Sequence, residues 1–184
     1  YYIPDRYDEG YGVSRKGIEY ANETGVKLII ILDCGIKAIE EIQYAKELGI
    51  DFIICDHHVP DDEMPSAVAI LNPKRSDDSY PFKHLCGCGV GFKLMQAFAK
   101  NNGIPFARLI PLLDFCAVSI AADIVPVTEE NRILAYHGLK TLNQNPSIGL
   151  KAIIDICGLG GRDISMSDIV FKIGPRINAS GRME

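Results

Sequence analysis

Residues 26–58 read VKLIIILDCGIKAIEEIQYAKELGIDFIICDHH, and the order of elements in this segment predicts the fold class. It opens with a nearly continuous β-branched and aliphatic run, 26–32, which predicts a strand buried on both faces. Apolar residues then recur at helical spacing over 36–48, and Gly49 ends this predicted helix as a C-terminal cap. A second apolar strand follows at 51–55. Strand, helix and strand at this spacing predict a parallel sheet with a crossover helix.

The same alternation extends in both directions along the chain. Tyr2-Ile3 is predicted as a strand and 14–20 as the helix that follows it. Residues 67–71 are predicted as a third strand of the sheet, and 72–84 are polar and rich in turn residues, which indicates a surface loop. The predicted fold class is therefore α/β, a parallel sheet flanked by helices.

The second half of the sequence predicts a mainly helical part. Its helical segments are 90–101, 105–122, 129–143 and 148–157. The polar stretch NQNPS at 143–147 suits a boundary. We predict a core unit over 1–143 and a helical connecting segment over 144–184.

Composition narrows the class of protein. A chain of 184 residues with 47% hydrophobic composition can bury one core, with room for the start of a second domain. No apolar run approaches the ~20 residues of a membrane span, and no signal peptide is recognisable, which predicts a cytoplasmic protein. The net charge of −5 provides no overall basic field for nucleic acid. A cluster of metal-binding carboxylates also produces an acidic total when its cations are not counted.

The cysteines favour reduced thiols. Cys86-Gly87-Cys88 is a C-x-C pair, but no second pair at zinc-ribbon spacing follows it. A structural zinc is the alternative, and buried free thiols are the better interpretation in a reducing compartment. The glycines at 87–91 follow a polar loop and no strand, so they lack the context of a nucleotide-binding loop.

Acidic residues stand directly after two predicted strands. Asp33 follows the first and Asp56 the second, while Gly35 lets the backbone turn sharply after Asp33. Ligands bind outside the carboxyl ends of strands in open parallel sheets. Since His57 and His58 come next, carboxylates and imidazoles together suit Mn²⁺, Mg²⁺ or Zn²⁺, and two such ions can clamp a phosphoryl group. Capping of the following helix is the alternative role for each aspartate.

Two further sets of residues are candidates for the same chemistry. Asp123 lies between apolar neighbours, where a carboxylate is costly to bury unless it is paired or metal-bound; a helix-end cap is the alternative. The run GPRINASGR, 174–182, places Arg176, Asn178 and Arg182 among flexible residues. The guanidinium group of arginine can pair with two phosphate oxygens at once. This run is therefore a candidate site for binding backbone phosphates, called the phosphate grip below, and a solvated loop before a helix is the alternative.

Taken together, these residues resemble the DHH phosphoesterase superfamily, which is named for its Asp-His-His motif. Within it, the chain is most similar to the exonucleases specific for single-stranded DNA. The stretches that carry the resemblance are YIPDR (2–6), EGYG (9–12), DCG (33–35), DHH (56–58), LNP (71–73), LCG (85–87), ADIVP (122–126) and 174–183. This ordered series spans nearly the whole chain.

The resemblance implies a role for each candidate in the metal site. Asp33 would bridge two divalent ions, most often Mn²⁺, with Mg²⁺ as the other candidate. His57 and Asp123 would complete the shell of the second ion. Asp56 and His58 would be the catalytic pair, with Asp56 supporting the site and His58 facing the scissile phosphate.

The resemblance also implies a substrate and a reaction. Arg176, Asn178 and Arg182 would line the substrate cleft. The implied reaction is 5′-to-3′ hydrolysis of single-stranded DNA by a metal-activated water, in recombination and repair, with other repair proteins as further partners. Two alternatives remain: a phosphodiesterase for short oligonucleotides or cyclic dinucleotides (or a pyrophosphatase), and a non-catalytic binding module derived from a DHH protein.

One departure from the superfamily pattern limits these expectations. The Asp-x-Asp motif of the first strand has no counterpart in the 184 residues. We expect that motif upstream of Tyr1, and a second domain and an oligonucleotide-binding barrel beyond Glu184. We therefore expect 1–143 to be a DHH catalytic core that lacks its first strand. Such a chain would bind metal weakly and would not degrade DNA by itself.

Overall fold

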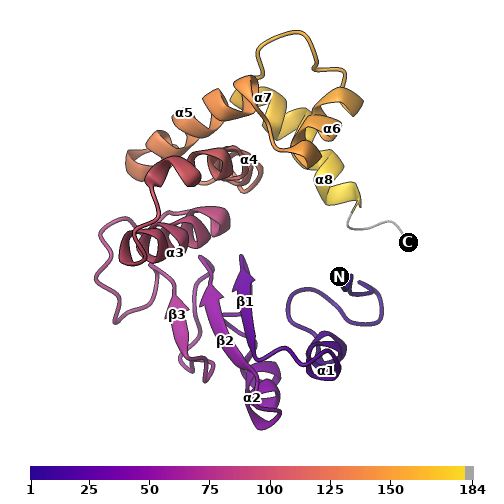
Figure 1. Cartoon of the computed structure of the whole chain (residues 1–184), viewed down its shortest axis with the longest axis vertical. Coiled ribbons are helices and arrows are strands. Elements are labelled where there is room, and N and C mark those ends of the chain that lie inside the picture. Colours follow the sequence, from indigo (N-terminus) through magenta and orange to yellow (C-terminus); the bar gives the residue numbers. More distant parts are fainter. Residues whose placement is uncertain (181–184) are drawn as a thin grey trace. The chain divides into compact units, whose positions relative to one another are not determined.

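The computed structural model describes residues 1–180, and the chain divides into two compact units. The first unit runs from Tyr1 to Lys83, and the second begins at His84 (Figure 1). The predicted functional boundary at residue 143 is a different division, and it stays a prediction.

The first unit is built on a parallel sheet. Within residues 1–180 the sheet has the order β1-β2-β3, with β1 at Leu28–Leu32, β2 at Asp51–Cys55 and β3 at Ala69–Leu71 (Figure 1). Helices α1 (Arg15–Glu23) and α2 (Ile39–Glu47) come before β1 and between β1 and β2. The predicted α/β class is confirmed. The register pairs Leu32 with Cys55 and Cys55 with Leu71, so the three strands end level with one another and their carboxyl ends share one edge.

The core of this unit lies on one side of β1. Ile29 and Ile31 pack against the cluster that α1 and α2 form through residues such as Ile18 and Ile42. The prediction that this strand is buried on both faces is wrong, because Leu28, Ile30 and Leu32 are 46%, 50% and 51% exposed. The unbroken apolar run is typical of a doubly covered strand, but these two helices cover only one face.

A second prediction also fails in this unit. Residues 1–5 form no strand. The hydroxyl of Tyr2 instead donates to Glu9 Oε2 at 2.5 Å, and the Tyr2 ring stacks on Tyr20 with centroids 5.2 Å apart. Side-chain contacts of this kind, and no sheet ladder, hold the first residues.

The second unit is helical, as predicted. Its elements are α3 (Gly87–Asn101), the 3₁₀ turns η1 (Phe106–Arg108) and η2 (Ile110–Leu112), α4 (Leu113–Ala122), α5 (Glu129–Gln144), α6 (Ile148–Ile156), α7 (Met166–Asp168), the π-helix η3 (Ile169–Ile173) and α8 (Gly174–Ser180). The helix predicted over 105–122 is interrupted, since Pro111 has no backbone N–H to donate and the chain forms short 3₁₀ turns before α4. Among the helices of residues 1–180, none has both the length and the apolar character needed to cross a membrane.

Helices α4 and α5 approach each other closely at Gly138. A Cβ added there would lie 2.1 Å from the carbonyl oxygen of Leu113 and 2.8 Å from Cβ of Ala117. The core beside this contact is formed by Val118 and Ala121 of α4 with Leu142 of α5, and it includes both ends of the π-helix. The helices of this unit are therefore tightly packed around α4.

Candidate metal centre

Asp33 is held in a strained turn at the carboxyl end of β1. Its backbone N–H donates to the carbonyl of Cys55 at 2.8 Å, which extends the β1–β2 ladder by one residue. Its φ is 66°, a left-handed conformation that aspartate tolerates better than most residues. Gly35 follows with φ 98°, and a Cβ there would lie 2.0 Å from Cδ1 of Ile31. The turn therefore needs glycine at residue 35, and it presents Asp33 at the edge of the sheet.

Asp56 ties the ends of β1 and β2 together. Its carboxylate is buried, with Oδ2 accepting the N–H of Ile36 at 3.0 Å. Oδ1 accepts the N–H groups of His57 (2.7 Å) and His58 (3.1 Å) and lies 2.6 Å from Nδ1 of the His58 ring. Burial alone would raise the pKa of Asp56, but these hydrogen bonds outweigh it and hold the pKa below its usual range. Asp56 is therefore an ionised carboxylate whose two oxygens already accept hydrogen bonds from Ile36, His57 and His58.

Asp33 and His57 bring their ligand atoms to one point. Oδ1 of Asp33 lies 3.1 Å from Nε2 of His57. This oxygen is buried, yet within residues 1–180 it has no hydrogen-bond partner of acceptable geometry. One ligand atom each from Asp33, His57 and His58 all lie within 4.8 Å of one another. A buried polar atom without a donor is costly, and a cation bound between carboxylate and imidazole would satisfy it. The residues present therefore fit a divalent metal ion.

His58 is positioned beside a cavity. Its ring is 52% exposed, and its backbone carbonyl accepts a hydrogen bond from Nδ2 of the buried Asn72 at 2.9 Å. The cavity has a volume of about 360 Å³, and its lining includes His58, Tyr11 and Lys37. Asn72, Tyr11 and Lys37 are not among the site residues predicted from the sequence. Asn72 could have been found, because it is the polar residue that directly follows the third strand at the same edge.

Two cysteines near the site, Cys34 and Cys55, have raised pKa values. Burial raises the pKa of Cys34 to about 11, and the charges of Asp56 and Asp33 contribute to this rise. Burial alone raises the pKa of Cys55 to about 11. In the C-x-C pair, Cys86 caps α3, since its Sγ accepts the N–H of Gly89 at 3.2 Å. None of the six cysteines forms a disulfide within residues 1–180.

Asp123 belongs to the second unit and ends α4. It is exposed at the C-cap of α4, the helix-end position given as the alternative, with Ser119 Oγ donating to its Oδ2 at 3.3 Å. The physical reason is that α4 stops here, and Ile124 turns the chain with a φ of 53°. This conformation is a strained one for a β-branched residue, and such strain gathers at functional sites. The role of Asp123 as a metal ligand stays a prediction.

Residues 174–180 of the predicted phosphate grip form the helix α8, so the loop of the alternative interpretation is not found over these residues. Arg176 and Asn178 lie on this helix, and both are exposed. Residues two positions apart on an α-helix point about 200° apart, so these two side chains face different directions. Nη1 of Arg176 donates to the carbonyl of Lys172 at 3.0 Å. Arg182 lies outside the described residues.

Comparison with known proteins places these features in a family. The model of the DHH family, N-terminal domain, matches residues 1–120. The chain is 42% identical over 184 residues to the single-stranded-DNA-specific exonuclease RecJ of Bacillus subtilis and 37% identical over 194 residues to RecJ of Escherichia coli. All of this chain is covered in both comparisons, but it spans only 23% and 34% of the length of these relatives.

Solved structures of similar proteins agree with this placement. A crystal structure of exonuclease RecJ bound to manganese matches 98% of this chain and 45% of its own, with a TM-score of 0.82 and 31% identity. RecJ of Thermus thermophilus in complex with Mn²⁺ matches 93% of this chain and 25% of its own, with a TM-score of 0.77 and 28% identity. Since the family match covers both strand-end turns and the Asp-His-His motif, the chain belongs to the DHH family.

Proposed function

We propose that this chain is part of the catalytic core of a single-stranded-DNA-specific exonuclease that hydrolyses phosphodiester bonds in the 5′-to-3′ direction. The observation that carries the proposal is the convergence of Asp33 Oδ1 and His57 Nε2, 3.1 Å apart at the carboxyl edge of the sheet. It is supported by the similarity to RecJ exonucleases along the whole of this chain.

The metal ligands follow from the same residues. Asp33 and His57 would hold a divalent ion, and Asp123 of the second unit would supply a further carboxylate to a two-ion site. Mn²⁺ is the first candidate and Mg²⁺ the second, because RecJ structures are described with each of these ions. When bound, such ions lower the pKa of a water molecule and neutralise phosphoryl oxygens.

His58 acts on the substrate side of the site. Because ionised Asp56 can only accept, Nδ1 of His58 carries the hydrogen in their 2.6 Å contact. This contact fixes the ring orientation, and Nε2 would then face the scissile phosphate from the lining of the cavity. Asn72 holds the backbone of the same residue. His58 is thus placed to stabilise charge on the phosphate as it is attacked.

Single-stranded DNA would be held by local contacts, since the net charge of −5 provides no general attraction. Arg176, Asn178 and Arg182 are the proposed grip on the DNA backbone, with each arginine able to pair with phosphate oxygens. A role in DNA recombination and repair, repair-protein partners and a cytoplasmic location extend the proposal.

The test uses the full product of the gene with Mn²⁺ and long single strands labelled at either end. We expect mononucleotides to be released from the 5′ end of single strands, and Asp33→Asn and His57→Ala to abolish this release. Asp77→Asn is the control, because it removes an exposed carboxylate of the same unit that pairs with Arg75 in a surface loop.

Other outcomes would overturn the proposal. Hydrolysis confined to dinucleotides or cyclic dinucleotides would identify a diesterase for small substrates. Binding of single strands without hydrolysis would identify a non-catalytic module. We also propose that the 184-residue chain alone lacks this activity, because it contains no Asp-x-Asp; robust Mn²⁺-dependent cleavage by the purified chain would contradict that.

A further inference from the structure

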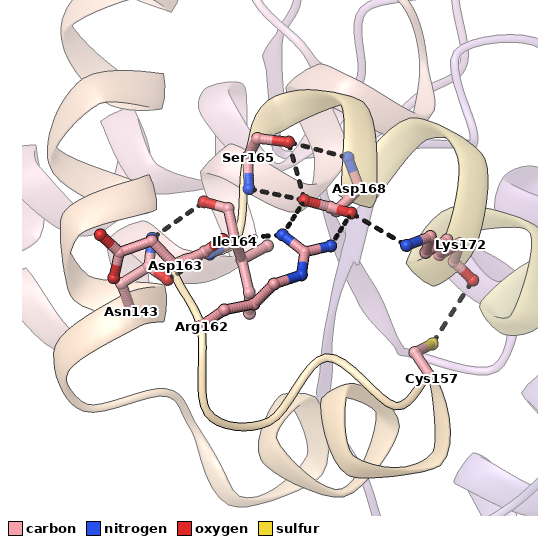
Figure 2. Close-up of polar contacts among 8 residues, drawn as sticks. All are labelled: Asn143, Cys157, Arg162, Asp163, Ile164, Ser165, Asp168 and Lys172. Atoms are coloured by element: carbon pink, nitrogen blue, oxygen red, sulfur yellow. Dashed lines mark hydrogen bonds and ion pairs between the residues drawn. The ribbon is translucent and has the colours of Figure 1, made fainter.

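Asp168 is the centre of a polar cluster in the second unit (Figure 2). Its Oδ2 and Oδ1 accept from the two terminal nitrogens of Arg162 at 2.9 and 2.5 Å, a bidentate pair. Oδ1 also lies 3.3 Å from Nζ of Lys172. Ser165 completes the cluster, since its N–H and hydroxyl both donate to Oδ2 and its Oγ accepts the N–H of Asp168, forming a capping box. The side chain of Asp168 is only 10% exposed.

The cluster sits at a fixed point of the unit. Just before Ser165, Ile164 is clamped by Asn143 of α5: its N–H donates to Asn143 Oδ1 at 2.7 Å, and its carbonyl accepts from Nδ2 at 3.0 Å (Figure 2). Ile164 itself is buried in the core. The start of the helix that follows is therefore held by both backbone and side-chain contacts.

From this point one continuous helical run leads to the proposed phosphate grip. It passes from α7 through the π-helix η3 into α8. Both ends of the π-helix, Ile169 and Ile173, are fully buried. A π-turn rotates everything after it relative to a regular helix, and such turns are frequent at functional sites. The direction in which Arg176 points thus depends on the turn that Asp168 begins.

Lys172 links Asp168 to Arg176. Its ammonium group binds Asp168, four residues before it, and its carbonyl accepts Nη1 of Arg176, four residues after it, at 3.0 Å. The same carbonyl also accepts from Sγ of Cys157 at 3.5 Å (Figure 2). Lys172 is therefore held on both sides, and Arg176 rests on a carbonyl whose place these contacts determine.

The beginning of α8 is also packed against α4. A Cβ added to Gly174 would lie 3.5 Å from Cβ of Ala122 and 3.2 Å from the carbonyl oxygen of Ile169. Ala122 directly precedes Asp123. The start of the predicted phosphate grip and the predicted third metal ligand are therefore neighbours within this unit.

We propose that Asp168 is a positioning residue for substrate binding, which acts through Lys172 to set where Arg176 presents its guanidinium group. This inference rests on the proposed function, in which Arg176 grips a backbone phosphate. Asp168 itself touches neither DNA nor metal in this assignment. Its ion pairs with Arg162 and Lys172 hold the first turn of the helical run formed by α7, η3 and α8. The rotation of η3 and α8 about the helix axis is fixed by this turn.

The test measures the affinity of the full gene product for a 3′-labelled oligothymidylate without added metal, over a series of salt concentrations. Arg176→Gln should weaken binding. It should also make the dependence of log affinity on log salt concentration shallower, by the amount expected for the loss of about one phosphate contact. Asp168→Asn should weaken binding on the order of tenfold, because a displaced contact residue loses its geometry. The double variant should bind no more weakly than Arg176→Gln alone, since both changes remove the same contact.

Two further variants separate positioning from other effects. Arg162→Lys keeps the positive charge but cannot pair with Asp168 in a bidentate way, so it should show part of the loss of DNA affinity expected for Asp168→Asn. It therefore tests the same ion pair if Asp168→Asn fails to fold. Glu130→Gln is the matched control: it breaks another ion pair of the same unit, Lys93–Glu130 at 2.5 Å, and should leave DNA affinity unchanged.

The outcomes distinguish the inference from the proposed function. If Arg176→Gln has no effect on affinity, the phosphate grip is wrong and the inference falls with it. If Arg176→Gln weakens binding while Asp168→Asn leaves it unchanged, the inference alone is wrong. Tighter binding by Asp168→Asn would also overturn it, because the freed charges of Arg162 and Lys172 would then be the main effect.

Discussion

The side-chain amide of Asn72 donates a hydrogen bond to the backbone carbonyl of His58 at 2.9 Å, and so joins the end of β3 to the Asp-His-His motif. Asn72 is fully buried, and its Oδ1 accepts the N–H of Lys74 at 2.9 Å. The side chain that faces the cavity is therefore held from two directions, by Asn72 through its backbone and by Asp56 through its ring.

Replacing Asn72 should impair catalysis without removing the metal. In the full gene product we expect Asn72→Ala to lower kcat about tenfold through misplacement of His58, with Mn²⁺ affinity unchanged. It should also lower the free energy of unfolding by about 1–3 kcal/mol, because buried polar groups lose partners. Asn131→Ala is the control, since Asn131 is equally buried and donates to the His84 and Pro126 carbonyls. That control should lose stability but keep kcat; a parallel loss of kcat would contradict the assignment.

Removing the carboxylate of Asp33 should separate metal affinity from stability. Asp33→Asn is expected to weaken Mn²⁺ binding at least about tenfold, as measured by calorimetry. The metal-free variant should be as stable as the parent or more so, because Oδ1 of Asp33 is buried without a hydrogen-bond partner within residues 1–180. Equal Mn²⁺ affinity in the variant and in Asp77→Asn would refute the proposed ligand set.

The turn at Gly35 should be more sensitive than a comparable glycine elsewhere. Gly49→Ala introduces strain at a φ of 71° with open space around the new Cβ, which should cost about 1 kcal/mol of unfolding free energy. Gly35→Ala adds to similar strain a Cβ that meets Ile31, and overpacking of this kind costs about 1–3 kcal/mol more. Urea denaturation of the two variants measures the difference. Equal losses would show that Ile31 moves aside freely.

Two helical glycines should respond to alanine with opposite signs. At Gly138 a new Cβ would collide with the backbone of Leu113, so Gly138→Ala should destabilise by about 3 kcal/mol or more as α4 and α5 separate. Gly149 is exposed on α6 with nothing near its added Cβ, and Gly149→Ala should stabilise by about 0.5–1 kcal/mol. Thermal unfolding of both variants tests the packing; a stabilised Gly138→Ala would show that α4 and α5 lie further apart.

Asp168 should make the stability of the chain dependent on acid. The hydrogen bonds from Arg162 and Ser165 and the ion pair with Lys172 hold the pKa of Asp168 far below its usual range. Because the folded pKa lies below the unfolded value, this contribution is present above about pH 4 and is lost as the pH falls toward the folded pKa. The urea midpoint of the parent should therefore fall more steeply below about pH 4 than that of Asp168→Asn. Parallel curves would contradict the role of this carboxylate.

The elements that local patterns encode could be predicted from the sequence. The strand at 51–55 is found at its predicted bounds, because a short apolar run between a glycine-capped helix and a polar turn has few other conformations available. Its neighbours begin or end within a few residues of their predicted positions, since the ends of elements depend on caps and contacts that the pattern does not contain. The break before α4 follows from Pro111, a local signal that outweighs the apolar periodicity of 105–122.

Exposure could not be predicted in the same way. The residues of β1 would suit burial on both faces, but exposure depends on which distant helices cover each face, and α1 and α2 cover one. For the same reason the apolar neighbours of Asp123 do not decide its burial, and the end of α4 leaves it exposed.

The sequence by itself determined the parallel order of strands and the placing of Asp33, Asp56, His57 and His58 at one edge of the sheet, because the chain direction of parallel strands brings their carboxyl ends together. Only the tertiary structure decided which of these side chains support the others. Asp56 is enclosed by donors, while Asp33 Oδ1 is left beside His57 Nε2. Asn72 gained its role in the same way, since a hydrogen bond between residues 14 positions apart depends on how packed elements bring the two groups together.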